Sequence, residues 1–198
     1  MKVLVACEYS GTVRDAFRAL GHDALSCDLL PTDRPGPHYQ GDVFDIIDDG
    51  WDLMVAHPPC TYLCSSGLHW NKRDASRAKK TDEALAFVQA LMNAPIDKIV
   101  IENPIGRIGT AIRKADQVVQ PYQFGHDASK QTALWLKGLP ILKPTKFIQP
   151  RLVDGKPRWS NQTDSGQNRL PPSPDRWKIR STTYQGIANA MAEQWGAG

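Results

Sequence analysis

The sequence predicts an α/β fold with a doubly wound, mostly parallel sheet. Its first thirty residues run as an apolar stretch "KVLVAC", a glycine turn, a helical segment "TVRDAFRALG" and a second apolar stretch "HDALSCDLL". This strand–helix–strand order predicts parallel strands joined by a right-handed crossover. A hydrophobic fraction of 41% in 198 residues is enough for the core of a single domain spanning residues 1–198.

The later elements follow from the same patterns. After a Pro-rich loop, apolar runs predict strands at 51–60, 96–104 and 130–140, and helical spacing predicts helices at 81–92 and 182–195. Pro, Gly, Asn and Ser accumulate from about residue 140 to 174, which indicates loops with a hairpin. The first helix, at 12–21 with Gly21 as its stop signal, has one apolar face: Val13, Ala16, Phe17 and Leu20.

Charge and cysteine content exclude little. A net charge of +3 neither requires nor opposes a nucleic-acid partner. No apolar run reaches the roughly 18 residues of a membrane span, and the N-terminus turns polar too soon for a signal peptide. The four cysteines are therefore expected to be reduced thiols in a cytoplasmic protein. Cys60 and Cys64 have no second Cys or His pair at matching spacing, so no metal site is predicted.

Polar residues follow most of the predicted strands. In a parallel α/β sheet, ligands bind outside the carboxyl ends of the strands. The strand ends are therefore expected to face one crevice, which favours an enzyme. The residues concerned are Glu8, Ser10, Asp28, Asp42, Cys60, Glu102 and Asn103.

Cys60 is the sharpest of these signals. A reactive cysteine is partly exposed and held in a polar turn, and Pro58 and Pro59 stiffen the chain just before it. The alternative is a buried cysteine that acts as a small hydrophobe, a role that the polar loop around Cys60 does not favour. That alternative is expected for Cys64.

The other candidates each have a plain structural alternative. Gly11 forms either a cofactor turn or an ordinary tight turn, and Asp28 binds a ribose diol or caps the next turn. Asp42 contacts an adenine or caps a helix. Glu102 exchanges a proton with a base or lies in a surface turn, where Asn103 can hydrogen-bond the turn.

Basic residues supply a further set of candidates. Lys130 binds a phosphate or a pyrimidine carbonyl, or is an exposed lysine before a strand. Basic side chains also surround Trp177 in a segment that suits a nucleic-acid backbone, although a solvated loop explains it nearly as well. These side chains are Arg169, Arg176, Lys178 and Arg180.

Together, these motifs resemble the cytosine-5 DNA methyltransferases in type and order. The most specific pair is "PPC" at 58–60 and "ENP" at 102–104, and "YQGIANAMA" near the C-terminus resembles the last cofactor motif. The resemblance covers most of residues 1–135 and about 180–195. It implies a Rossmann-like fold of the S-adenosylmethionine-dependent methyltransferase type, with S-adenosylmethionine as cofactor and DNA as partner.

The resemblance also implies a role for each site residue. Cys60 attacks carbon 6 of a flipped-out cytosine, Glu102 bonds or protonates N3, and carbon 5 takes the methyl group. Asp28 holds the cofactor ribose and Asp42 its adenine. The expected catalytic residues are Cys60, Glu102, Asn103 and Lys130. The expected cofactor-binding residues are Glu8, Tyr9, Ser10, Gly11, Asp28, Leu29, Asp42, Val43, Pro58, Gly186 and Asn189.

The chain also departs from the family pattern. Pro104 stands where the family usually has valine, Lys130 is the candidate to replace a cytosine-contacting arginine, and the first motif lacks the usual Phe and extra glycines. Residues 140–179 form only a short irregular insert in place of a full target-recognition domain. This compactness resembles phage-borne members of the family, for which the host cytoplasm is expected.

Two alternative functions stay open. The first is modification of carbon 5 in a free pyrimidine nucleotide, or modification with another one-carbon donor. The second is a catalytically inactive protein that binds nucleic acid or a partner.

Overall fold

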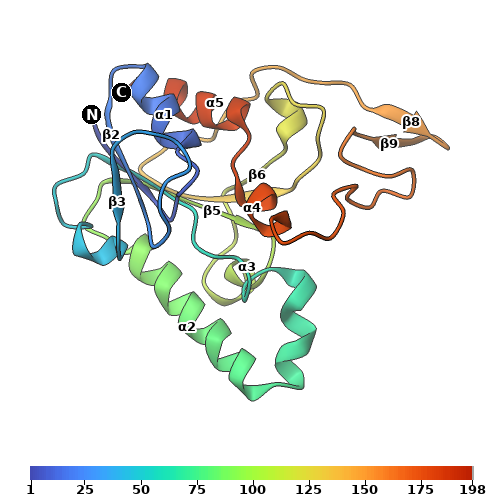
Figure 1. The fold of residues 1–198 in the computed structure, drawn as a ribbon, viewed down its shortest axis with the longest axis horizontal. Helices are drawn as coiled ribbons and strands as arrows, with labels where there is room; N and C mark the ends of the chain where they lie inside the picture. Colours follow the sequence, from blue (N-terminus) through green and yellow to red (C-terminus); the bar gives the residue numbers. More distant parts are fainter. Residues whose placement is uncertain (198) are drawn as a thin grey trace.

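The computed structural model describes residues 1–197 and is built on a seven-stranded sheet (Figure 1). The strand order is β3-β2-β1-β4-β5-β7-β6, and all strands run parallel except β7, which is antiparallel to both neighbours. The strands are β1 (Lys2–Ala6), β2 (Asp23–Asp28), β3 (His38–Gln40), β4 (Leu53–Ala56), β5 (Lys98–Pro104), β6 (Gln117–Val119) and β7 (Thr132–Lys137). The predicted mostly parallel α/β sheet is confirmed.

Helices cover both faces of this sheet. Helices α1 (Thr12–Ala19) and α5 (Gln185–Trp195) pack on one face, and α2 (Ala75–Met92) and α3 (Arg107–Ala111) pack on the other. Figure 1 shows α1 and α5 side by side at one end of the molecule and α2 away from them. The remaining helix is α4 (Arg176–Ser181), and three short 3-10 helices are η1 (Val43–Asp45), η2 (Ser65–Lys72) and η3 (Pro121–Gln123).

Strand β1 shows why the sequence folds into two layers. Val3 and Val5 point into the core beneath α1 and α5, whereas Leu4 and Ala6 point into the core beneath α2. All four side chains are fully buried. A strand buried on both faces reads as a continuous apolar run, which is the pattern that predicted it.

Helix boundaries differ from the prediction in three helices, and α5 begins at Gln185 rather than at residue 182. Helix α2 begins at Ala75 rather than Thr81, because the Asp74 side chain accepts hydrogen bonds from the Ser76 and Arg77 amides and caps the helix. Its first turns are polar and exposed, so apolar spacing does not mark them. Leu20, expected on the apolar face of the first helix, follows the end of α1 and is 51% exposed.

Several short elements lie in segments predicted as loops. Strand β3 falls within the Pro-rich stretch, and β6, α3 and α4 are each six residues or shorter. The hairpin expected between residues 140 and 174 is present as β8 (Arg151–Val153) and β9 (Lys156–Arg158). Among residues 1–197, no helix has both the length and the apolar character needed to cross a bilayer.

The start of α5 depends on a glycine. The Gly186 amide donates to Nε2 of His126 at 2.8 Å, and a Cβ on Gly186 would overlap the carbonyl oxygen of Phe124. Burial lowers the pKa of His126, which keeps the ring neutral and able to accept this bond. Gly186 therefore has a packing role at this position, whether or not it also borders a cofactor.

We expect Gly186→Ala to lower the free energy of unfolding by about 1–3 kcal/mol, because the added methyl group must displace the backbone. Gly109→Ala is the matched control: apart from its chain neighbours and the backbone of its own helix, no atom lies within 4 Å of a Cβ there, so alanine should stabilise α3 by about 0.5–1 kcal/mol. Urea unfolding measures both. Equal stabilities of the two variants would contradict the packing role of Gly186.

Candidate active site

The carboxyl ends of β4 and β5 bring two of the predicted motifs together. The strands pair in parallel, and continuing their register places His57 beside Glu102 and Pro58 beside Asn103. Both pairs are hydrogen-bonded across 45 residues of sequence. The Glu-Asn-Pro motif is not a turn but the last three residues of β5, where it pairs with β7. It and the Pro-Pro-Cys turn therefore lie at one edge of the sheet.

Glu102 is a buried acid held by a histidine. Nδ1 of His57 lies 2.8 Å from Oε2 of Glu102, and the two side chains are 10% and 11% exposed. Burial raises the pKa of Glu102, but the hydrogen bond from His57 and the charges of His57 and Lys130 outweigh it, so the pKa lies below its usual value. The sequence pointed to Glu102 but not to His57, whose only signal is its place directly before two prolines.

Asn103 braces the turn that carries the thiol. Its Nδ2 donates to the carbonyl oxygen of Pro58 at 2.7 Å, and the residue is buried. The carbonyl oxygen of Cys60 in turn accepts from the amides of Leu63 and Cys64, both at 3.0 Å. The backbone around Cys60 is therefore fixed from two sides.

Cys60 itself is half-buried. Burial raises the pKa of its thiol, and the charges of Cys64 and Glu102 add to this rise, whereas a backbone hydrogen bond and Lys130 oppose it only in part. Cys60 is therefore a protonated thiol at neutral pH. Cys64, expected to be a buried hydrophobe, is also half-buried, and its Sγ lies 3.3 Å from Oγ of Ser66.

Lys130 belongs to the same group of charges. Its ammonium lowers the pKa of both Cys60 and Glu102, which places all three side chains within one electrostatic neighbourhood. Its Nζ donates to the carbonyl oxygen of Arg180 at 2.7 Å. Helix α4 therefore contacts Lys130, one of the expected catalytic residues.

Helix α4 also contacts the expected cofactor side. The Tyr9 hydroxyl donates to the carbonyl oxygen of Lys178 at 3.1 Å and lies 2.7 Å from Oγ of Ser181. Nζ of Lys178 pairs with Asp33 in the loop after β2 at 2.6 Å. The short helix thus connects the end of β1, the loop after β2 and Lys130.

The turn between β1 and α1 is closed by an acid. Oε1 of Glu8 accepts from the Val13 amide at 2.7 Å and from the Ser10 hydroxyl at 3.1 Å, while Oε2 accepts from the Arg14 amide at 3.2 Å. Gly11 precedes the helix with a φ of 71°, a conformation that favours glycine. Glu8 and Ser10, both expected at the cofactor, are therefore committed to the N-terminus of α1.

Asp28 and Asp42 both act as caps. Oδ1 of Asp28 accepts from the Leu30 amide at 2.9 Å, and Oδ1 of Asp42 accepts from the Phe44 amide at 3.0 Å. These are the structural alternatives that the sequence offered for each. Burial is the main cause that raises the pKa of Cys27 to about 12, and the charges of Asp28 and Asp42 add to the rise. Both carboxyl groups therefore lie near Cys27, at the carboxyl end of β2.

The neighbours of these aspartates differ in exposure. Leu29, directly after Asp28, is 73% exposed, whereas Val43 after Asp42 is buried. Burial raises the pKa of Asp28, and the Leu30 amide, His38 and the Leu29 amide oppose this rise. An exposed apolar side chain beside a half-buried carboxyl group can cover the face of a flat ring.

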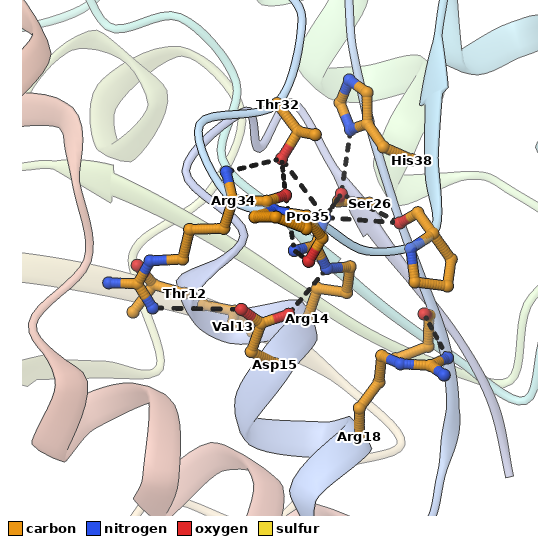
Figure 2. Close-up of polar contacts among 12 residues, drawn as sticks. Thr12, Val13, Arg14, Asp15, Arg18, Ser26, Thr32, Arg34, Pro35 and His38 are labelled. Carbon is orange, nitrogen blue, oxygen red and sulfur yellow. Dashed lines mark hydrogen bonds and ion pairs between the residues drawn. The ribbon is translucent and has the colours of Figure 1, made fainter.

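A buried arginine holds the loop that follows Asp28, and sequence reasoning missed it. The Arg14 guanidinium is fully buried. It pairs with Asp15 at 2.8 Å and donates to Ser26 at 3.1 Å and Thr32 at 3.2 Å, and Figure 2 shows these contacts converging on it. It also donates to carbonyl oxygens of the loop, those of Arg34, Pro35 and Pro37.

The two C-terminal cofactor candidates lie apart from these contacts. Gly186 packs against Phe124 and His126. Asn189 is exposed on α5, and its Oδ1 accepts from Nε2 of Gln185 at 2.9 Å. Helix α5 packs on α1. Asn189 is therefore linked to the first motif only indirectly, through the contact between these two helices.

The short insert forms an open groove of about 850 Å³, which is lined by the charged residues Arg169, Arg176 and Asp164 together with residues 163, 165, 167–168 and 170–172. Trp177 beside it is 56% exposed, and its ring centroid lies 5.8 Å from that of Tyr9. The groove and the expected cofactor turn are therefore adjacent through α4.

Neither the protein-family models nor the curated proteins compared with this chain give a match.

We expect Asn103→Ala to lower the free energy of unfolding by about 1–3 kcal/mol, because the buried Pro58 carbonyl loses its partner. Asn103→Asp should cost more, because a carboxylate would face that carbonyl oxygen. Asn189→Ala, at an exposed position, is the control and should change stability by less than about 0.5 kcal/mol. Urea unfolding without cofactor tests this, and similar values for the Asn103 variants and the control would contradict it.

Proposed function

We propose that this chain is an S-adenosylmethionine-dependent methyltransferase that methylates carbon 5 of cytosine in DNA through a covalent Cys60 adduct. The observation that carries the proposal is the meeting of the Pro-Pro-Cys turn and buried Glu102 at the carboxyl ends of the parallel strands β4 and β5. His57 bonds Glu102 there, and Asn103 bonds the carbonyl oxygen of Pro58 just before Cys60. The charge of Lys130 acts on both Cys60 and Glu102. Attack on a pyrimidine ring requires a nucleophile and a proton donor on one base.

The chain's own residues supply the steps that activate the base. The Cys60 thiolate adds to carbon 6 while Glu102 donates a proton to N3, so that carbon 5 becomes an enamine carbon. Lys130 favours the thiolate, since its charge lowers the pKa of Cys60. Bound S-adenosylmethionine would supply the methyl group as an electrophile. Loss of the carbon-5 proton to water, with return of the N3 proton to Glu102, would then expel Cys60 as a thiolate.

The residues at the ends of β1 and β2 fit such a cofactor. A helix N-terminus at this turn commonly binds phosphate, but here the Glu8 carboxylate takes the Val13 and Arg14 amides. S-adenosylmethionine carries no phosphate, so this arrangement suits it better than a dinucleotide. Asp28 would hold the ribose and the exposed Leu29 would cover the adenine.

The strand order supports the same choice. The order β3-β2-β1-β4-β5 is that of doubly wound nucleotide-binding sheets, in which a sixth parallel strand lies beside the fifth in dinucleotide-binding enzymes. Here the antiparallel β7 takes that position. One nucleoside site at the end of β2 therefore fits the sheet better than two.

The short insert favours DNA over a free nucleotide. Its groove is open and lined by Arg169 and Arg176, and guanidinium groups suit phosphate oxygens. A duplex base must also leave the stack to reach Cys60. The groove beside α4 would hold the strand on which this occurs.

We expect Cys60→Ala to abolish methyl transfer to DNA while cofactor binding survives, because only the nucleophile is removed. Cys64→Ala, at the neighbouring half-buried thiol, is the control and should keep most of the activity. Transfer of tritium from labelled S-adenosylmethionine measures the activity, and mass spectrometry of nucleosides from DNA and from nucleotide incubations identifies the product. Full activity of Cys60→Ala would refute the nucleophile.

We expect Asp28→Ala to weaken S-adenosylmethionine binding about 10- to 100-fold, the loss of roughly 1.5–3 kcal/mol for hydrogen bonds to a charged acceptor. Asp23→Ala is the control, since Asp23 is exposed at the opposite end of β2. Titration calorimetry compares the two. Unchanged affinity in Asp28→Ala would remove Asp28 from the cofactor site, and no binding by the unmodified chain would contradict the proposed function.

A further inference from the structure

His57 lies directly before the Pro-Pro-Cys turn and is bonded to the proposed acid. We infer that His57 is a positioning residue of methyl transfer: its Nδ1–H holds Oε2 of Glu102, which leaves Oε1 to donate to N3 of the cytosine. This inference deepens the proposed function and rests on it.

The geometry gives His57 little freedom. Its backbone amide donates to the carbonyl oxygen of Ala6 at 2.9 Å, which fixes residue 57 at the end of the central strand. Its side chain is only 10% exposed and lies 2.8 Å from Glu102. On the other side, Glu102 is fixed by the pairing of β5 with β7, where it lies opposite Leu134. Two rigid strands therefore set the distance between the imidazole and the carboxyl group.

The hydrogen-bond pattern assigns the imidazole to Glu102. Among residues 1–197, Nε2 of His57 is buried and has no hydrogen-bond partner. Its Nδ1 must carry a hydrogen whenever Glu102 is ionised, because a carboxylate only accepts. Of the two carboxylate oxygens, Oε2 has a partner in the described part of the chain and Oε1 has none.

This donor has a defined effect on the proposed reaction. When Glu102 gives its proton to N3, negative charge develops on a carboxyl group that is almost fully buried, where an unpaired charge is costly. The Nδ1–H of His57 already points at Oε2 and stabilises that charge without reorganisation. The other ionisable groups nearby are Lys130, which also favours the carboxylate, and Cys60.

The sign of the pH effect follows from the Cys60–Glu102 pair. Burial and neighbouring charges raise the pKa of Cys60, while His57 helps to lower that of Glu102. Over a wide range the pair therefore holds one proton, and a second binds only as pH falls through the pKa of Glu102. The reactive pair, a Cys60 thiolate and a protonated Glu102, also holds one proton. The methylation rate should therefore fall at pH values below the pKa of Glu102, where the pair holds two protons. Loss of His57 should raise the pKa of Glu102 and move this fall to higher pH.

His57→Leu removes the donor at similar size, and His57→Asn keeps an N–H near the position of Nδ1. We expect His57→Leu to lower the single-turnover methylation rate about 100-fold and to shift the acidic limb of the pH–rate profile upward. The affinity for S-adenosylmethionine should not change. His57→Asn should recover at least part of the rate. Urea unfolding of each variant is measured alongside.

The outcomes separate the inference from the proposed function. If the unmodified chain transfers no methyl group, the proposed function fails before any His57 variant is read, and the inference falls with it. If the unmodified chain is active, a His57→Leu enzyme with its rate and profile unchanged overturns the inference alone. The inference is also overturned if the rate falls only in proportion to the loss of stability in urea, the acidic limb of the pH–rate profile does not move, and His57→Asn recovers no rate.

Discussion

The parallel register between β4 and β5 is the constraint on which the site depends. Leu53–Ala56 and Ile99–Ile101 are buried throughout, and Ala56 lies opposite Ile101. One step beyond that pair, the register aligns His57 with Glu102 and then Pro58 with Asn103. A slip of one residue would turn every side chain of β5 to the other face of the sheet. The apolar cores on both faces therefore also fix the polar contacts at the edge.

Segments far apart in the chain meet at this edge because each is held by a different kind of contact. Cys60 is positioned through Asn103, and Glu102 through His57. Lys130 is held by the carbonyl oxygen of Arg180, at a sequence separation of 50 residues. Removing one of these hydrogen bonds would shift only the side chain that it holds, because Cys60, Glu102 and Lys130 share no contact. The register of the strands would not change.

The sequence indicates this site only in part, for a physical reason. Strands β1 and β4 and the first part of β5 are apolar runs, and ligand-binding residues lie at the carboxyl ends of such strands in parallel sheets, so Cys60 and Glu102 could be predicted as candidates from pattern alone. His57 and Arg14 could not. The partner of His57 is 45 residues away, and Arg14 binds a loop about 20 residues away, so neither contact leaves a local pattern. The start of α2 was missed because a single side chain, Asp74, sets it.

The protonation of the site bears on the proposed role of Cys60 as a nucleophile, because the pKa of its thiol is raised. At neutral pH the resting pair is a Cys60 thiol and a Glu102 carboxylate, which together hold one proton. The proposed reactive pair, a thiolate and a carboxylic acid, holds the same number. Reaching it therefore needs a proton to move within the site rather than to leave for solvent, and the populations stay constant with pH between the two pKa values. Lys130 favours both the thiolate and the carboxylate, so it stabilises the anion on either side of that exchange, whereas a pyrimidine N3 beside Glu102 would favour the acid.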